Sequence, residues 1–193
     1  MVIADEIYEH MIFNGKHVSF ASLDGMQERT VTVNGLSKGF AMTGWRIGYL
    51  AAPDWLASAT AKIQGQFTSG ANAIAQVASV AALDMGRACH EHMKNVFRDR
   101  RDLALKQLSD IPGLRLNKPR GAFYVFPDAR EYLQGASVSN SEQLCEHLLV
   151  NGHVATVPGA AFGDDHCFRR SFAAPEPTLR RGIDRIAESL ARL

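Results

Sequence analysis

The stretch that decides the fold lies at residues 34–49 and reads N-G-L-S-K-G-F-A-M-T-G-W-R-I-G-Y. It places Lys38 and Arg46 in a glycine-rich turn. A lysine between small residues can approach a bound carbonyl group closely, and an arginine eight residues later can return to the same cavity and hold an anion. Taken alone, the same residues are more simply a solvated surface lysine in an ordinary turn, so the surrounding sequence must decide.

The composition is that of a soluble globular protein, with 46% hydrophobic and 21% charged residues. A length of 193 residues can bury the core of one good-sized domain, or of one and a half. The 21 basic and 20 acidic side chains create no strong overall field, so neither nucleic acid nor a membrane is expected as a partner. No stretch is long and apolar enough to span a bilayer.

The cysteines and histidines give no sign of a metal site. Cys89, Cys145 and Cys167 are odd in number and widely spaced, so they form neither a disulfide framework nor a CxxC motif. We interpret them as reduced thiols and expect a cytoplasmic protein. His90 and His92 are close in sequence, but an H-x-H pair on a helix points its imidazoles to different sides. We therefore expect no metal.

The first part of the chain alternates strands and helices. We predict strands at residues 2–4, 30–33 and 45–52 and helices at 54–65 and 73–84. The last of these helices is apolar on most sides, which implies burial against a sheet or a partner subunit. The first strand begins almost at Met1, whereas a buried parallel strand normally lies between others, so we expect a truncated chain.

The second part has a different pattern. A long amphipathic helix is predicted at residues 91–108, and I-P-G at 111–113 stops it. Short strands and helices then mix, which is typical of a compact α+β unit. The strands are expected at 114–116, 122–126, 154–157 and 168–172, the helices at 141–149 and 177–192, and a flexible loop at 135–140.

Polar side chains follow the first strand. Asp5 and Tyr8 come at its carboxyl end, where open α/β sheets place ligand-binding groups, although Asp5 could instead cap a helix or turn. Ser37 and Ser69 lie in no G-x-S-x-G elbow, and the residues around Lys38 do not match the G-x-x-x-x-G-K-[ST] phosphate loop. Both of these alternative chemistries are weak.

Six segments, in this order, resemble the class I aminotransferases that use pyridoxal 5'-phosphate (PLP), a fold-type-I family. They are D-E-I-Y-E-H, the stretch at 34–49, I-Q-G-Q-F-T-S-G-A-N, R-G-A-F-Y-V-F-P, V-P-G-A-A-F-G and R-R-S-F-A. The resemblance implies an α/β fold: residues 1–90 form the C-terminal part of the PLP-binding large domain, with a mixed, mostly parallel sheet. Residues 91–193 form the linking helix and an α+β C-terminal small domain.

The resemblance also implies roles for the cofactor-binding residues. Lys38 forms the Schiff base with PLP and moves the proton of the substrate Cα. Asp5 pairs with the protonated ring nitrogen of the cofactor, and Tyr8 hydrogen-bonds the ring oxygen. Arg46 grips the phosphate group, and Ser37 adds a contact to it.

Further positions are implied less directly. Arg169 grips the substrate α-carboxylate, although without the family Arg169 and Arg170 are simply an exposed basic pair. Arg170 stands where the family usually has an apolar residue, which leaves the packing of that strand open. Gly121 lets the backbone pass near the substrate. Four polar residues come near the active site of the neighbouring subunit in a homodimer: Gln66, Thr68, Ser69 and Asn72.

The implied reaction transfers an amino group from an amino acid, with aspartate as the expected donor, to a 2-oxo acid. Family members are roughly twice this length, and the half that is absent here holds the glycine-rich phosphate turn and the aromatic residue stacked on the ring. The sequence therefore leaves three alternatives: an aminotransferase chain that needs its other half, a PLP-dependent lyase or synthase of the same fold, and a non-catalytic assembly remnant.

Overall fold

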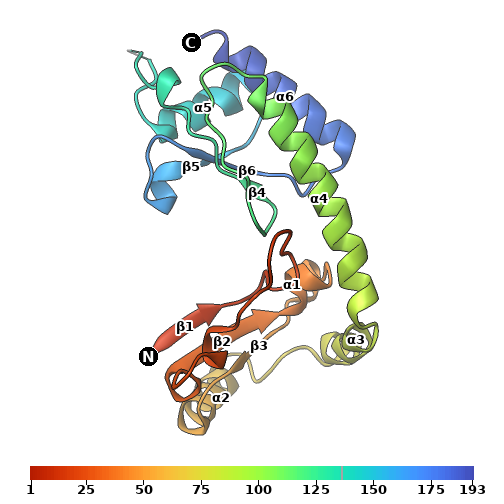
Figure 1. Ribbon diagram of the computed structural model, residues 1–193. Coiled ribbons are helices and arrows are strands. Elements are labelled where there is room, and N and C mark those ends of the chain that lie inside the picture. Colours follow the sequence, from red (N-terminus) through yellow and green to blue (C-terminus); the bar gives the residue numbers. More distant parts are fainter. Residues whose placement is uncertain (136) are drawn as a thin grey trace. The chain divides into compact units, whose positions relative to one another are not determined.

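The computed structural model describes residues 1–135 and 137–193, apart from the side chain of Arg87. Ala136, in the loop predicted at 135–140, lies outside the described residues. The chain divides into two compact units, Met1–Lys94 and Asn95–Leu193 (Figure 1). None of the described helices is long and apolar enough to cross a membrane.

The first unit is built on a three-stranded sheet with the order β1-β2-β3. Its strands are β1 Val2–Asp5, β2 Thr30–Gly35 and β3 Gly48–Ala51; β1 and β2 are parallel, and β3 is antiparallel to β2. The helices are the short α1 Leu36–Gly39, α2 Asp54–Phe67 and α3 Ala73–Asp84, with 3-10 turns at Phe20–Ser22, Gln27–Arg29 and Thr43–Trp45.

The second unit packs two helices and one end of a third against a small antiparallel sheet of order β4-β6-β5. The long α4 Arg87–Ser109 begins in the first unit and continues into the second. The other elements are β4 Tyr124–Val125, α5 Ser141–Gly152, β5 Val157–Pro158, β6 Phe168–Ser171 and α6 Glu176–Leu190, with 3-10 turns at Arg130–Tyr132 and Gly159–Phe162.

The core of this second unit explains why its segments fold as they do. Apolar residues recur at helical spacing in α5 and α6 and are fully buried, as are Phe168 and Phe172. The helix residues in this core are Leu144, Leu148, Leu179, Ile183, Ile186 and Leu190.

Five predicted strands are shorter than expected. The strand predicted at 122–126 is reduced to Tyr124–Val125, and the one predicted at 168–172 ends at Ser171. In the first unit, Trp45 belongs to a 3-10 turn and Arg46 has φ +53°, in the left-handed region, so the strand predicted at 45–52 begins only at Gly48. The strand predicted at 114–116 is reduced to one bridge from Arg115 to Asp128, and the one predicted at 154–157 starts at Val157.

Helix α3 has the predicted bounds, and the Asn72 side chain caps it by accepting a hydrogen bond from the Ala75 amide (3.2 Å). Its predicted burial, against a sheet or a partner subunit, is found within this unit for its small residues only. Ala75, Ser79 and Ala82 are buried, but Ile74 and Val77 are 72% and 73% exposed. The small residues of α3 therefore face its own unit, and the large apolar ones face away.

Arg170 is buried instead of forming an exposed basic pair with Arg169. Its Nη2 donates to the carbonyl oxygen of Leu179 (3.0 Å), and its Nη1 has no hydrogen-bond partner. Burial lowers the pKa of Arg170 to about 10. Gly182 makes room for the guanidinium, because a Cβ at that position would lie 2.5 Å from Nη2.

This pairing predicts a coupled effect on stability. Arg170→Met should raise the free energy of unfolding by about 1 kcal/mol, because it removes a buried, incompletely paired charge. Gly182→Ala should lower it by about 1 kcal/mol in the wild type, through the clash with Nη2, but raise it in the Arg170→Met background, where helix propensity dominates. Urea titrations of the four proteins measure the coupling, and strictly additive effects would contradict it.

Candidate active site

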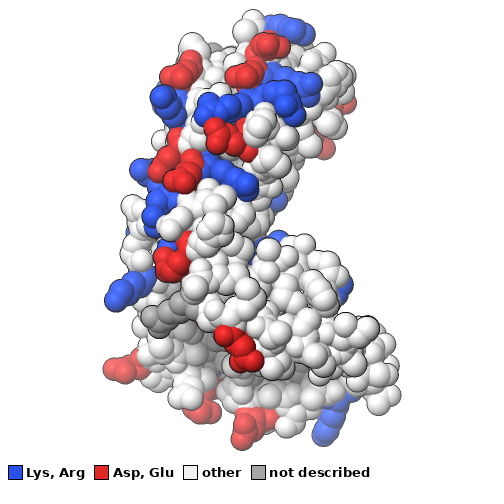
Figure 2. Space-filling model, turned by 90° about the vertical axis from the view of Figure 1, so that its right-hand side faces the viewer, with Lys and Arg blue, Asp and Glu red and all other residues white. Residues whose placement is uncertain are grey.

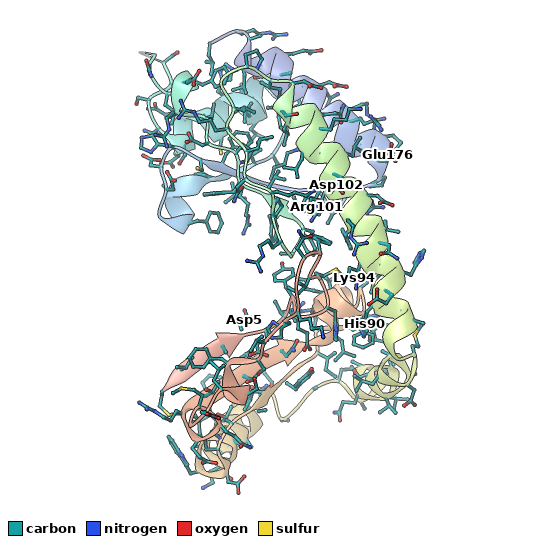
Figure 3. All side chains as sticks on the ribbon, in the orientation of Figure 1. Asp5, His90, Lys94, Arg101, Asp102 and Glu176 are labelled. Carbon is teal, nitrogen blue, oxygen red and sulfur yellow. The ribbon has the colours of Figure 1, made fainter. Side chains whose placement is uncertain are left out.

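Three of the predicted site residues lie at one edge of the first sheet, namely the end at which β1 and β2 finish and β3 begins. Asp5 ends β1 and pairs with Val33 of the parallel strand β2. Lys38 follows the end of β2 directly, on α1. Because β3 runs antiparallel to β2, its first residue lies opposite the last residue of β2, and Arg46 precedes that point. The acid, the amine and the guanidinium thus follow the order of the strands β1, β2 and β3 along one edge. Figure 1 shows the three strands, and Figure 3 labels Asp5.

Gly35 permits the close approach that brings the Lys38 turn beside the residues that follow Arg46. A Cβ at Gly35 would lie 3.0 Å from the Ile47 carbonyl oxygen and 3.1 Å from the Gly48 Cα. A side chain would push these two backbone segments apart. Gly35 lets the two segments approach this closely, whereas a Cβ would require them to separate by a few tenths of an ångström.

Lys38, Ser37 and Tyr8 are half-buried, whereas Asp5 is exposed. The Asp5 Oδ1 accepts a hydrogen bond from the Ile7 amide (3.2 Å) and so supports the turn that follows β1. Residues 7–10 form a turn and not a helix, so the Asp5 side chain supports a turn and does not cap a helix. This hydrogen bond occupies one of the two carboxylate oxygens.

Arg46 lines a cavity of about 780 Å³ within the first unit. Its Nη1 donates to the carbonyl oxygen of Thr43 (2.8 Å), and its side chain is exposed. Of the four polar residues predicted near a subunit boundary, Thr68 and Asn72 line this cavity, and Gln66 and Ser69 are not among its lining residues. Gln64, which the sequence analysis did not single out, also lines the cavity and hydrogen-bonds Thr68.

Glu6, next to Asp5, is a buried carboxylate that was not among the predicted site residues. It accepts hydrogen bonds from His17 Nε2 (2.9 Å), Ser19 Oγ (3.0 Å) and the Phe20 amide (3.0 Å). Burial alone would raise the pKa of Glu6, but these hydrogen bonds outweigh it, so the pKa lies below its ordinary value. Glu6 therefore ties the connection before Phe20 to the residues that follow β1.

Replacing Glu6 should make the first unit less stable at neutral pH. A carboxylate with a lowered pKa stabilises the fold above its ordinary pKa, and this contribution is lost as pH falls through the folded-state value. Glu6→Gln should cost about 2 kcal/mol at pH 7 and should flatten the loss of stability below about pH 4.5. Urea unfolding followed by the fluorescence of Trp45 and Trp55 measures this, and an unchanged acid profile would contradict it.

Arg169 lies on β6 in the second unit, where two aromatic rings hold its guanidinium. The Arg169 Cζ is 4.4 Å from the centroid of the Tyr124 ring and 4.4 Å from that of Phe162. Within the described ranges Arg169 makes no salt bridge, so its guanidinium is oriented by stacking. Gly121 lies in the loop before β4, next to Ala122, which has φ +57°.

Comparisons with known proteins show the family to which the chain belongs. Residues 1–186 match the model of the family "Aminotransferase class I and II". The chain is 51% identical to the bifunctional aspartate aminotransferase and glutamate/aspartate-prephenate aminotransferase of Petunia hybrida, over 100% of this chain and 42% of the relative. It is 41% identical to the aspartate aminotransferase of Rhizobium meliloti strain 1021, over 100% of this chain and 48% of that protein.

Solved structures give the same result. The aspartate aminotransferase from Rhizobium meliloti aligns with a TM-score of 0.92 at 40% identity, covering 99% of this chain and 50% of that one. An aromatic aminotransferase from Pyrococcus horikoshii aligns with a TM-score of 0.91 at 40% identity. The alignment covers 100% of this chain and 51% of that one. The predicted α/β fold and the predicted resemblance are confirmed. This chain belongs to the class I and II aminotransferase family, and it spans about half the length of the relatives it matches.

Proposed function

We propose that this chain carries the cofactor-attachment lysine of a PLP-dependent aminotransferase, which transfers an amino group from aspartate to a 2-oxo acid. The observation that carries the proposal is the placement of Asp5, Lys38 and Arg46 along one edge of the β1-β2-β3 sheet. An amine, a carboxylate and a guanidinium at one edge fit the aldehyde, the ring nitrogen and the phosphate of PLP, respectively. The cofactor, when bound, supplies a ring that accepts the electron pair released as the substrate Cα loses its proton.

The residues of this edge have separate tasks. Lys38 attaches the cofactor through its amine and then, released by the incoming substrate amine, carries the proton from the substrate Cα. Asp5 keeps the ring nitrogen protonated, since a carboxylate stabilises the positive charge beside it. Arg46 binds the phosphate group, for which a forked guanidinium is well suited, and Ser37 adds a hydroxyl donor. Tyr8 donates a hydrogen bond to the ring oxygen.

Arg169 binds the α-carboxylate of the substrate in this proposal. The Tyr124 and Phe162 rings fix the plane of its guanidinium, so less conformational entropy is lost when a carboxylate binds. Aspartate is proposed as the donor because the curated relatives named above are aspartate aminotransferases. The free cysteines, of which Cys145 and Cys167 are buried, are consistent with a reducing cytoplasm.

The apolar surface of α2 and α3 supports a homodimer assembled with the remaining half of the enzyme. Ile74, Val77, Val80 and Leu83 of α3 and Phe67 of α2 are more than half exposed. Few charged side chains interrupt the part of the surface that belongs to the first unit in Figure 2. Apolar patches of this kind mark surfaces that another chain covers. We expect the isolated chain to elute as a dimer or larger species, and a stable monomer would contradict this proposal.

The test combines the chain with the part of the Rhizobium meliloti relative that it does not cover, supplied as a separate polypeptide. With PLP, aspartate and 2-oxoglutarate, the pair is expected to release oxaloacetate and glutamate in equal amounts. Release of ammonia instead would favour the lyase or synthase alternative. Absence of any covalent PLP adduct on the chain, alone or combined, would favour the non-catalytic remnant.

A further inference from the structure

Glu9 holds the residues that enter the lysine turn. Its Oε1 accepts a hydrogen bond from Asn34 Nδ2 (2.7 Å), near the end of β2. The Asn34 Oδ1 in turn accepts from the Gly35 amide (2.8 Å). Asn34 is buried, so this chain of hydrogen bonds fixes the backbone just before α1.

His10 and His90 hold the residues that leave the turn. The two imidazole rings are stacked, with their centroids 3.7 Å apart and an angle of 16° between their planes. His90, on the first turn of α4, donates from Nδ1 to the carbonyl oxygen of Gly39 (2.9 Å; Figure 3). Gly39 leaves space for the other ring, because a Cβ there would lie 2.6 Å from the His10 Cδ2. The Phe40 ring packs edge-on against His90.

We propose that Glu9, His10 and His90 form a positioning clamp, called here the histidine clamp, which fixes both ends of the turn that carries Lys38 and loosens when the His10 imidazole becomes protonated. The proposal rests on the proposed function of Lys38 as the cofactor-attachment residue. These three residues act through the backbone of the turn, so they are positioning residues. Glu9 and His10 are adjacent in sequence and hold opposite ends of residues 34–39. Glu9 bonds Asn34 at the first end, and His10 stacks on His90, which bonds Gly39 at the second end.

The pH dependence follows from the packing of the rings. Burial lowers the pKa of His10, the nearby His90 and His17 lower it further, and Glu9, 3.5 Å away, opposes them. The charged groups that line the cavity around the pair come from two segments: Glu9, Lys16 and His17 from the loop after β1, and Glu91 and Lys94 from α4. Glu91 and Lys94 form an ion pair (2.6 Å), so their charges largely cancel near the stack.

A fall in pH weakens the clamp. A histidine with a lowered pKa in the fold is more readily protonated when the clamp opens, so acid favours the open state. The clamp therefore contributes fully above the ordinary histidine pKa of about 6.5 and progressively less as pH falls below it.

Hydrogen–deuterium exchange measures the clamp without any cofactor. The amides of Phe40 and Met42 both donate to the Leu36 carbonyl oxygen, so their protection reports on the turn. In the 193-residue chain, peptides covering residues 36–45 should lose protection about fivefold between pH 7.5 and pH 5.5, after correction for intrinsic exchange, and His10→Phe should abolish this pH dependence. His90→Phe, which keeps a ring but no donor, should be about fivefold less protected at pH 7.5.

Two further variants separate the clamp from general destabilisation. His90→Asn keeps a donor toward Gly39 and should remain within about twofold of the wild type at pH 7.5. His147→Phe removes another ring that donates to a backbone carbonyl, that of Ser189, and should leave peptides 36–45 unchanged. If His90→Phe also lowers the amide protection of α2, that variant is destabilised generally. The proposal is then tested by the pH dependence of protection in His10→Phe and in the wild type.

The proposal is overturned if His90→Phe protects the turn as well as the wild type, or if His10→Phe keeps the pH dependence. A separate measurement tests the proposed function. If that function is wrong, reduction of a PLP adduct with borohydride at pH 7.5 labels a lysine other than Lys38. Labelling of Lys38 together with pH-independent protection refutes the clamp alone. Labelling of another lysine refutes the proposed function of Lys38, so the clamp then has no role in catalysis even if the exchange data match the prediction.

Discussion

Replacing Lys38 by alanine is expected to abolish the borohydride-stable attachment of PLP to this chain. The expected loss is complete, because a covalent attachment needs an amine and alanine has none. Lys38 is half-buried directly after β2, at the edge where Asp5 and Arg46 also lie, whereas Lys62 on α2 is exposed. Absorbance of the chain with PLP, before and after reduction, and the mass of the reduced protein measure the attachment.

Two matched variants make this result specific. Lys62→Ala removes an exposed lysine from the same unit and should leave attachment unchanged. Lys38→Arg keeps the positive charge but replaces the amine by a guanidinium that does not lose its proton at neutral pH, and it should behave like Lys38→Ala. Full attachment in Lys38→Ala, with the mass of one cofactor retained, would remove Lys38 from the mechanism.

The second large effect is expected at Asp5. Asp5→Asn should reduce the rate of amino-group transfer by about 10²–10³-fold in the complemented enzyme, because an amide cannot hold the ring nitrogen in its charged, electron-accepting form. Attachment of PLP to Lys38 should persist, since the amine is untouched. The variant therefore separates the rate of the reaction from covalent attachment, and stopped-flow half-reactions with aspartate measure it.

The control for Asp5 takes account of its structural hydrogen bond. Asp5 Oδ1 also accepts from the Ile7 amide, and the asparagine carbonyl oxygen can replace that contact, so the turn after β1 should stay intact. Asp24→Asn changes a charge in an exposed turn of the same unit and should leave the rate unchanged. A rate in Asp5→Asn within about threefold of the wild type would show that Asp5 has no electrostatic role.

Much of the fold follows from local sequence patterns. A short apolar run predicts β1, β-branched residues predict β2, and a run of Ala, Ile and Val predicts α3. Arg46 was misplaced because W-R-I-G-Y-L has the composition of a strand. Hydrophobic pattern carries no information about a positive φ at an arginine, so the start of β3 could not be predicted.

Contacts between residues far apart in sequence were not predictable. The stack of His10 on His90 joins the loop after β1 to α4, and no spacing rule connects two positions so far apart. The space that Gly182 leaves for Arg170 depends likewise on how α6 packs on β6. The apolar face of α3 was predicted to be buried, but the surface that would cover it is not within this chain.

The most direct test of the central claim is to map the site of PLP attachment in the wild-type chain. The chain is incubated with PLP, reduced with borohydride and digested, and the modified peptides are identified by mass spectrometry. The proposed function predicts that one reduced adduct predominates, on Lys38. An adduct spread over Lys16, Lys62, Lys94, Lys106 and Lys118, with no preference for Lys38, would contradict it.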